Sequence, residues 1–146
     1  LARTHLAAAP LAGANLEPAN LQLANLQGAN LYKANLAGAD LADATAEVFD
    51  LAGGRVSDLA GANLYEANLE GANLRGTVLS GANLRRANLR RAHLWGAYLK
   101  EADLRGAGLW GAKRQSAYLK DARLDPLQRF RLWLRSTWCM GAGSVD

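Results

Sequence analysis

The stretch that decides the fold is GANLRRANLRRAHLWGAYLKEADLRGAGL, residues 81–109. It repeats every five residues, a period that matches neither the turn of a helix nor the two-residue alternation of a strand. Leucine holds one position of each repeat, as at Leu84 and Leu89, and alanine stands two places before it. Asparagine or aspartate usually lies between them, and the other two positions vary. Self-similarity at a fixed period predicts a solenoid.

The same repeat covers most of the chain in two blocks. Leucine falls at every fifth position over residues 6–41, and it does so again over residues 59–124, three positions out of phase. In the second block Thr77 takes an alanine place and Arg114 takes a leucine place. The segment 45–58 between the blocks keeps the repeat poorly. We predict that it is a kink, a bulge or a looped-out coil.

A five-residue period makes a fold if each repeat forms one side of a square coil. Four repeats then complete a turn of about twenty residues, and every fifth side chain points at the axis. Leucine fills the interior, and alanine fits a second inward position where a larger side chain would crowd the next coil. Backbone groups pair with neighbouring coils at about 4.8 Å. We predict an all-β solenoid over residues 1–124, a β-helix of about six coils at that spacing.

The corners of such a coil need residues that tolerate turns. Asparagine and aspartate can bond their own backbone, which suits a position beside the inward leucine. Glycine just before the alanine, as at Gly61 and Gly96, permits backbone angles that other residues resist.

Residues 125–146 are different in kind. Asp125 and Pro126 read as a helix N-cap followed by proline in the first helical position. The expected helix places its apolar residues on one face: Leu127, Phe130, Leu134 and Trp138. We predict a C-terminal capping α-helix, because the open end of a β-helix carries unpaired backbone groups. Docking of this helix on a partner or on a membrane surface is the alternative.

The repeat resembles that of the pentapeptide-repeat family, whose motif is A(D/N)LXX, across residues 6–124. The resemblance implies a right-handed quadrilateral β-helix. It implies less about function, because many members have no known role, especially in cyanobacteria. A subset protects DNA gyrase from quinolones or other poisons by imitating DNA. A shared fold does not settle activity.

The sequence offers no chemistry that would support an enzyme. His5 and His93 are far apart, and Cys139 is the only cysteine, so neither zinc-ligand spacing nor a nucleophile pair is present. Carboxylates on a convex rod have no cleft to desolvate them, and active sites need concavity. We predict no catalytic residue, no metal site and no cofactor.

The apolar segments bear on location. No run reaches the roughly eighteen apolar residues of a membrane-spanning helix, and the first residues do not form a convincing signal peptide. We expect a cytoplasmic protein, with association to a membrane-bound assembly as the alternative. Because the sequence begins with Leu1 rather than methionine, we also expect a trimmed or partial chain.

Charge is distributed unevenly along the chain. Residues 1–60 carry three basic and six acidic side chains, whereas residues 61–146 carry fourteen basic and seven acidic ones. The first part is therefore acidic and the second strongly basic, within an overall net charge of +4. A protein that imitates DNA needs acidic columns, which this pattern supplies only weakly.

Residues twenty apart should lie over one another, so exposed columns can be read from the sequence. This spacing predicts ion pairs of Glu66 with Arg86 and of Glu70 with Arg90. It also predicts that Arg75 stacks under Trp95, that Arg90 lies under Trp110, and that Tyr98 lies under Tyr118. Arginine and tryptophan are frequent interface anchors. We predict a partner-binding surface of nine residues: Arg85, Arg86, Arg90, Arg91, Trp95, Tyr98, Arg105, Trp110 and Tyr118.

We therefore predict a non-catalytic scaffold or adaptor that presents a rigid β-helical surface to protein partners, which could belong to a multi-subunit assembly. The first alternative is gyrase protection by imitation of DNA. The second is direct nucleic-acid binding through the arginine-rich coils, because phosphate contacts are mainly made by lysine and arginine. Self-association into a homo-oligomer is left open.

Overall fold

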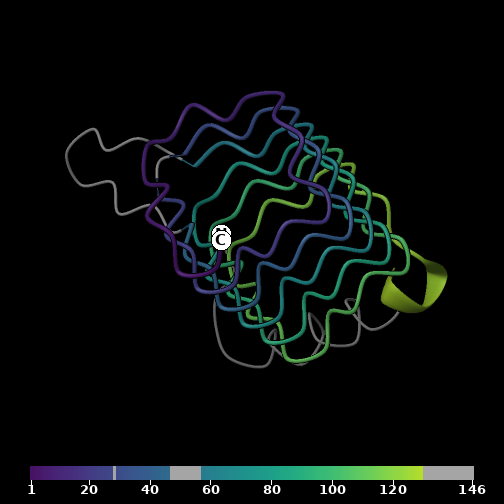
Figure 1. Cartoon of the computed structure of the whole chain (residues 1–146). Coiled ribbons are helices and arrows are strands. Elements are labelled where there is room, and N and C mark those ends of the chain that lie inside the picture. The colour runs from purple at the N-terminus through teal and green to yellow at the C-terminus, as the bar shows by residue number, and fades with distance from the viewer. Residues whose placement is uncertain (28, 47–56, 130–146) are drawn as a thin grey trace.

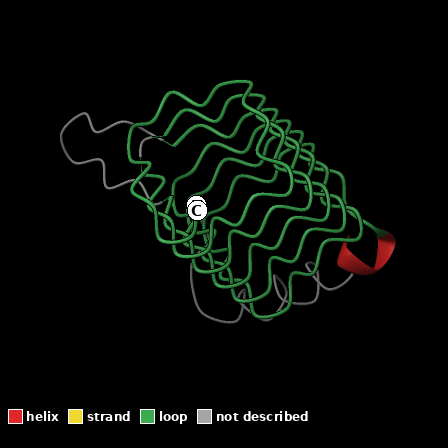
Figure 2. Ribbon diagram, viewed as in Figure 1, coloured by secondary structure: helices red, strands yellow, loops and turns green. Residues whose placement is uncertain are grey.

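The computed structural model describes residues 1–27, 29–46 and 57–129, which wind into a stack of coils (Figure 1). Single-residue parallel bridges join each coil to the next, from His5 with Asn25 to Asp103 with Arg123. The described residues form these bridges and turns rather than extended strands (Figure 2). Most bridges join residues twenty apart in sequence, such as Asn83 and Asp103. The coil length predicted from the repeat is therefore confirmed.

Backbone hydrogen bonds run along the rod axis from each repeat in both directions. The Leu84 N–H donates to the Asp103 carbonyl of the following coil at 2.8 Å. The Asn83 N–H donates to the Ala62 carbonyl of the preceding coil at 2.9 Å. Because both neighbours are engaged, the buried backbone polar groups are satisfied without extended strands. The solenoid is thus held together by its main chain.

A tight turn follows every inward leucine. The Ala87 N–H donates to the Leu84 carbonyl at 3.1 Å, and the Asn83 Oδ1 accepts from the Arg85 N–H at 3.3 Å. The residue just before the alanine has positive φ whether or not it is glycine, with 66° at Gly96 and 58° at Arg86. Positive φ in the third residue is a requirement of a type II turn.

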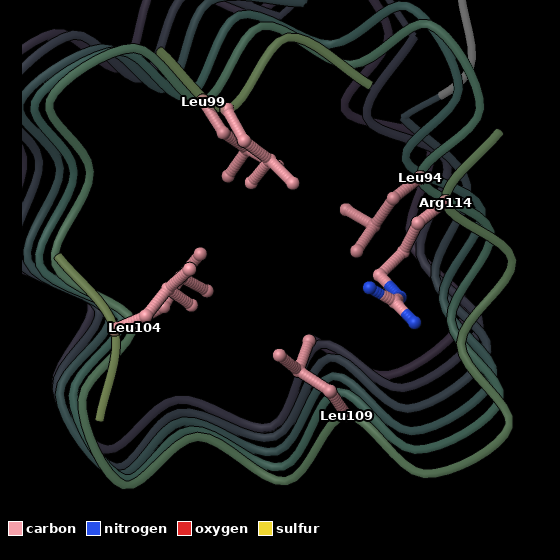
Figure 3. A pocket seen from close by; sticks show the side chains of 7 residues that line it. Leu94, Leu99, Leu104, Leu109 and Arg114 are labelled. Carbon is pink, nitrogen blue, oxygen red and sulfur yellow. The ribbon is translucent and has the colours of Figure 1, made fainter. Parts of the chain in front are cut away.

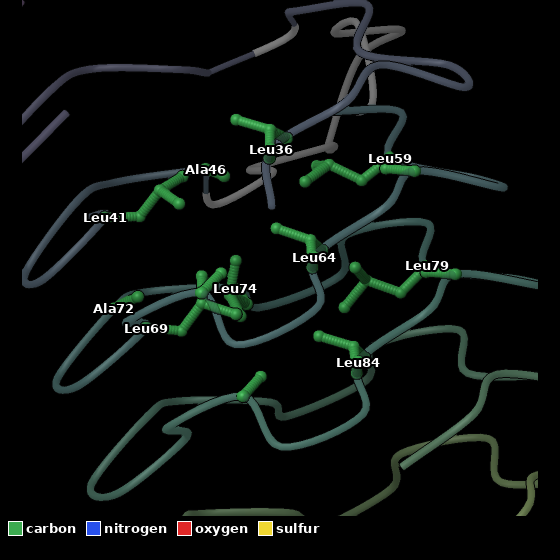
Figure 4. Packing of buried hydrophobic residues seen from close by; sticks show 14 of the residues in the cluster. Leu36, Leu41, Ala46, Leu59, Leu64, Leu69, Ala72, Leu74, Leu79 and Leu84 are labelled. Carbon is green, nitrogen blue, oxygen red and sulfur yellow. The ribbon is translucent and has the colours of Figure 1, made fainter. Parts of the chain in front are cut away.

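Leucine and alanine form one continuous core along the axis. Leu36, Leu64 and Leu84 are each 0% exposed and lie one above another in successive coils (Figure 4). Leu104 is 1% exposed and continues the column beyond Leu84, because their neighbours Asn83 and Asp103 are bridged. The inward position of leucine is confirmed. The right-handed sense of the coil is the one that the family resemblance implies.

The break between the two blocks leaves the stacking intact. The bridge offset rises from twenty residues between Asn25 and Thr45 to twenty-eight between Asn30 and Asp58, so eight extra residues lie between Thr45 and Asp58. Thr45 and Asp58 themselves pair like any other repeat. The rest of the predicted break, residues 47–56, lies outside the described residues.

Two buried hydroxyl groups flank this insertion. Ser57 occupies an alanine place, is fully buried, and donates to the Leu26 carbonyl at 3.1 Å. Thr77 occupies the alanine place of the next coil and donates to the Ala46 carbonyl at 3.0 Å. Both hydroxyl groups therefore bond the backbone at the points where the regular coil stops and resumes. They explain why alanine is replaced at these two places.

The leucine shaft ends in a different environment. Arg114 takes the inward place above Leu94, and the other sides of the shaft are formed by leucines such as Leu99, Leu104 and Leu109 (Figure 3). A hollow of about 10 Å³ remains between them. That volume is on the scale of a single water molecule. A charged side chain thus replaces leucine where the described shaft opens.

The described chain ends with helical residues 126–129. Asp125 Oδ2 accepts from the Gly106 N–H at 2.6 Å. Gln128 donates to the Leu104 and Ala107 carbonyls, both at 2.9 Å, and its amide oxygen accepts from the Asp125 N–H. These side chains replace bonds that the backbone of a further coil would make. Leu127, in contrast, is 73% exposed.

The remainder of the predicted helix face, Phe130, Leu134 and Trp138, lies outside the described residues, as does Cys139. No helix within residues 1–27, 29–46 and 57–129 is long and apolar enough to span a membrane.

Candidate interaction surface

The coil register divides the nine predicted contact residues between two opposite walls of the rod. We define the arginine wall as the face of Asn68, Asn88 and Gly108 together with the corners on either side of it. It carries six of the predicted residues: Arg85, Arg86, Arg90, Arg91, Arg105 and Trp110. The aromatic wall is the face of Val78, Tyr98 and Tyr118 with the corner of Trp95. The columns predicted from the sequence are present, and the nine predicted residues lie on two opposite walls.

Three glycines lie beside the arginine stems of the arginine wall. Gly106 follows Arg86 in its column, and a side chain there would lie 3.2 Å from the Arg86 Cγ. Gly108 lies beside Arg90, and Gly111 beside Arg91, with corresponding distances of 3.9 and 3.5 Å. Of these three glycines, Gly106 would therefore be crowded by an arginine stem if it carried a Cβ, whereas the other two distances are ordinary van der Waals contacts. The arginines form a row of cationic groups across the wall.

Arg86 is held by two groups of the preceding coil. Its Nη1 donates to the Glu66 carboxylate at 3.2 Å and to the Tyr65 hydroxyl at 3.1 Å. Its guanidinium lies 6.0 Å from the centre of the Tyr65 ring. Hydrogen bonds from Tyr65 and from Arg86 lower the pKa of Glu66, and the hydrogen bond to Glu66 raises the pKa of Arg86. The predicted Glu66–Arg86 ion pair is present.

The neighbouring prediction for Arg90 is wrong. Glu70 accepts a hydrogen bond from the Asn88 amide at 3.1 Å instead of pairing with Arg90. The tryptophan contact comes from Arg91, whose guanidinium lies 5.9 Å from the centre of the Trp110 ring. Arginine side chains are long enough to reach diagonally between columns. Arg90 is consequently exposed, without a side-chain hydrogen bond or ion pair to any described residue.

Arg105 is bound within its own repeat. Its Nε and Nη2 donate to the two oxygens of Asp103 at 2.9 and 2.6 Å. This bidentate contact lowers the pKa of Asp103 and raises the pKa of Arg105. Both charges are therefore partly neutralised, which makes Arg105 a weaker candidate for partner binding than Arg85 or Arg90. The sequence signal was the two-residue spacing of opposite charges across an inward leucine.

The aromatic wall presents rings in a regular stack. Tyr98 and Tyr118 are stacked with their centres 4.9 Å apart and their planes within 7°. Arg75 lies 4.6 Å from the centre of the Trp95 ring. Trp95 is 49% exposed and Tyr118 55% exposed. The predicted Arg75–Trp95 and Tyr98–Tyr118 contacts are confirmed, and one side of this wall remains open to solvent.

Sequence reasoning missed a ladder of side-chain amides along the rod. The Asn83 amide donates to the Asn63 Oδ1 at 3.0 Å, Asn63 donates to Asn35 at 3.0 Å, and Asn35 donates to Asn15 at 3.2 Å. Each oxygen also accepts a backbone N–H two residues later, as at Asn83. The recurrence of asparagine every twenty residues was the available signal. The ladder adds side-chain hydrogen bonds to those of the main chain.

The described residues offer little for metal binding. In the part of the chain that the structure describes, no three histidine, cysteine, aspartate or glutamate side chains are grouped to hold a metal ion.

Comparison with known proteins supports the assignment of the repeat. The family model for pentapeptide repeats matches residues 9–45, 57–96 and 82–113, in eight copies. No curated protein matches the sequence. The solved structure of HetL, a pentapeptide repeat protein involved in heterocyst differentiation regulation from the cyanobacterium Nostoc, is 34% identical with a TM-score of 0.68. The match covers 84% of this chain and 62% of HetL, so the chain spans less than two thirds of that relative.

Two further structures are similar at lower TM-scores. Rfr23, a pentapeptide repeat protein from the cyanobacterium Cyanothece, is 38% identical over 75% of this chain and 62% of its own, with a TM-score of 0.23. QnrB1, a plasmid-mediated fluoroquinolone resistance protein, is 17% identical over 97% of this chain and 75% of its own, with a TM-score of 0.36. Neither likeness supports a shared function. Together with the coil geometry, the family match over more than half of the sequence shows that the chain belongs to the pentapeptide-repeat family.

Proposed function

We propose that the protein is a non-catalytic scaffold that binds protein partners through its exposed walls. The observation that carries this proposal is the separation of an interior of leucine and alanine from ordered outward columns of arginine and aromatic side chains. Backbone bonds on both sides fix each column in place, so little conformational freedom is lost when a partner binds. Arginine, tryptophan and tyrosine are also the residues enriched at interface hot spots.

The likeness to HetL supports a regulatory setting for this scaffold. HetL is involved in the regulation of heterocyst differentiation. A role in which this chain holds or blocks a regulatory protein would need a surface and no catalytic group, which matches the proposal. The match covers 62% of HetL. That this chain has regulatory partners is therefore part of the proposal.

The test is affinity capture from the native source, followed by titration with the purified partner. One variant replaces Arg85, Arg86, Arg90 and Arg91 by alanine. A matched control removes the same charge elsewhere, at Lys100, Lys113, Lys120 and Arg123. A third variant replaces Trp95, Tyr98 and Tyr118 by alanine.

We expect either the four-arginine variant or the aromatic variant to lose the partner, and the charge control to keep it. The residues that dominate binding cluster in one part of an interface. Equal loss in the charge control would contradict a site-specific scaffold. A nucleic acid bound in a salt-dependent way by the intact protein, and lost in the four-arginine variant, would favour the nucleic-acid alternative instead.

The segment after the coils has a proposed structural role that complements the scaffold. We propose that residues 126–146 close the end of the rod, and the contacts of Asp125 and Gln128 with the last coil support this role. Deletion of residues 126–146 should lower the thermal stability or cause end-to-end association, because the coil edge would lose the hydrogen bonds from Gln128 to the Leu104 and Ala107 carbonyls. An equally stable, monomeric truncated protein would contradict the capping role.

A further inference from the structure

The arginine wall changes sign along the rod. From Glu17 to Gly71, its described residues carry five acidic side chains and no basic one: Glu17, Asp40, Asp43, Glu66 and Glu70. The next two coils of the same wall carry five basic side chains: Arg85, Arg86, Arg90, Arg91 and Arg105. The change occurs between two adjacent coils. The wall is therefore anionic on one side of this change and cationic on the other, although its two ends carry Arg3 and Asp125 in the same corner columns.

This separation of charge is a property of one wall rather than of the rod as a whole. At the diagonally opposite corner, Lys100 pairs with Glu101 of the same repeat at 3.3 Å. Lys120 and Asp121 occupy the same two places one coil later. Opposite charges there alternate around the corner, so they cancel locally. On the arginine wall Arg86 and Arg105 are likewise paired, with Glu66 and Asp103, but Arg85 and Arg90 form no ion pair with a described residue.

The groups on both sides of the sign change are accessible. Arg85 and Arg90 are exposed and make no side-chain hydrogen bond or ion pair with the described residues. Glu66 is exposed but is ion-paired with Arg86 of its own chain, and Glu70 is half-buried with one carboxylate oxygen bonded to Asn88. Gly106, Gly108 and Gly111 add no side chain to the cationic half, whereas Trp110, which is 69% exposed, projects from its corner. The wall thus presents accessible charges of both signs to a partner.

A partner that lies along this wall must also change sign. A uniform polyanion would be attracted to the arginines and repelled by the acidic coils. A uniform polycation would be attracted to the acidic coils and repelled by the arginines. A second copy of the chain, turned end for end, carries the complementary order of charges at the matching spacing. We propose that the arginine wall is the contact surface of an antiparallel homodimer.

The two-fold axis of this dimer is fixed by the charge boundary. We place the axis in the plane of the wall, perpendicular to the rod, between the coil of Glu70 and the coil of Arg90. Each corner column of one copy then faces the same corner column of the other copy, with the order of the coils reversed. Glu70 then faces the partner's Arg90, and Glu66 faces the partner's Arg85 and the partner's Arg86. A two-fold interface repeats every such contact in the reciprocal direction. The acidic and basic halves are thereby satisfied in both copies.

This inference rests on the proposed function only in that it uses the arginine wall for protein contact. The aromatic wall faces away from the proposed dimer and stays open to other partners. Contacts between exposed charges are strongly screened as salt rises, because the Debye length falls from about 8 Å at 0.15 M to about 3 Å at 1 M. The dimer should accordingly form at low ionic strength and dissociate at high ionic strength.

Sedimentation velocity of the full chain over a range of concentrations tests the proposal. Glu66→Arg with Glu70→Arg makes the centre of the wall basic, and Arg85→Glu with Arg90→Glu makes it acidic. We expect each of these proteins alone to be monomeric, and we expect an equimolar mixture of the two to recover the dimer. Lys100→Glu with Lys120→Glu, an equal change of charge at the opposite corner, should leave the wild-type dimer intact.

Circular dichroism establishes that each variant keeps its fold. Where a reversal variant fails to fold, the neutral variants Glu70→Gln and Arg90→Gln replace it, and each should weaken the dimer at low salt. A wild-type protein that remains monomeric at low salt overturns the proposal, as does a reversal mixture that stays monomeric. A monomeric chain that still binds a partner through the arginine wall would leave the scaffold function standing and remove only the dimer.

Discussion

At the residue scale, the turn position before each alanine accepts glycine and larger residues alike. Gly71 and Gly96 have φ of 66°, while Arg86 and Arg91 have φ of 58°. A residue with a Cβ costs roughly 1–2 kcal/mol in the left-handed region. At Arg86 this cost is partly offset by the contacts with Glu66 and Tyr65. Glycine is thus a local choice at this position rather than a condition of the fold.

The environment of each glycine should determine the effect of replacing it. A Cβ at Gly96 meets open space, whereas a Cβ at Gly71 would collide with the Asp43 carboxylate. We expect Gly96→Ala to lower the free energy of unfolding by about 1 kcal/mol, and Gly71→Ala to lower it more. Urea denaturation gives both values. Adding Asp43→Ala should bring the Gly71→Ala loss to the Gly96→Ala level, and a persistent difference would contradict the collision.

The Asp103–Arg105 contact should make stability depend on pH. The pKa of Asp103 is lowered in the folded protein, so the contact stabilises the fold above the ordinary aspartate pKa of about 3.8. This stabilisation is lost as the pH falls through the lowered pKa. We expect Arg105→Gln to lower the free energy of unfolding slightly at pH 7, because the contact is exposed, and to have no effect once Asp103 is protonated in both states. Urea titrations at several pH values measure the difference, and a cost that does not change with pH would oppose this account.

At the element scale, the insertion between the two blocks shows how a repeat tolerates an interruption. Eight extra residues enter between Thr45 and Asp58, yet the bridges on both sides keep their partners. Thr77 departs from the alanine consensus because its hydroxyl bonds the Ala46 carbonyl next to the insertion. A departure that looked like a weak repeat in the sequence therefore has a specific structural role.

Restoring the consensus at this position should be harmful. We expect Thr77→Ala to lower the free energy of unfolding by about 1 kcal/mol, because the buried hydrogen bond to Ala46 is lost. Thr77→Ser keeps the hydroxyl and should retain most of the stability. Thermal and urea denaturation of the three proteins provide the comparison. A stabilised Thr77→Ala protein would show that the hydroxyl bond contributes nothing.

The same scale shows what could be predicted from the sequence and what could not. Coil length and inward leucines follow from the five-residue period, and so do vertical pairs such as Arg75 with Trp95. The predicted Glu70–Arg90 pair is absent for a local reason, because the Glu70 carboxylate accepts a hydrogen bond from the Asn88 amide instead. Register places side chains in columns, but competition among short and long side chains decides which atoms meet. The repeat spacing alone does not predict which of these side chains form the contact.

At the scale of the whole molecule, each coil contacts the coils on either side of it, so coils behave as interchangeable units. Deletion of residues 84–103 removes one complete coil and joins Asn83 to Leu104 in register. We expect this protein to fold cooperatively with a lower Tm and a smaller denaturant m-value, because less surface is buried.

Deletion of residues 84–101 provides the control for that experiment. It removes almost as much chain, but it places the inward leucines out of register. We expect this protein not to fold, as judged by circular dichroism. Equal folding of both deletion proteins would contradict the coil as the structural unit.

Charge at the same scale bears on gyrase protection. A DNA mimic needs an anionic surface along the rod, but the arginine wall is anionic over one half and cationic over the other. We therefore expect no protection of gyrase supercoiling activity from a quinolone, even with excess protein. Protection that grows with protein concentration would contradict this expectation and restore the DNA-mimic alternative.

The asparagine ladder has a consequence for how the protein ages. Deamidation of asparagine begins when the next backbone nitrogen attacks the side-chain amide carbon, and asparagine is accordingly a thermolabile residue. Here that nitrogen belongs to an inward leucine and is tied to the next coil, as Leu84 is to Asp103, while the Asn83 oxygen and amide are both bonded. Ring closure would require these bonds to break together. A rod built from so many asparagines should therefore keep its amides for as long as it keeps its coils.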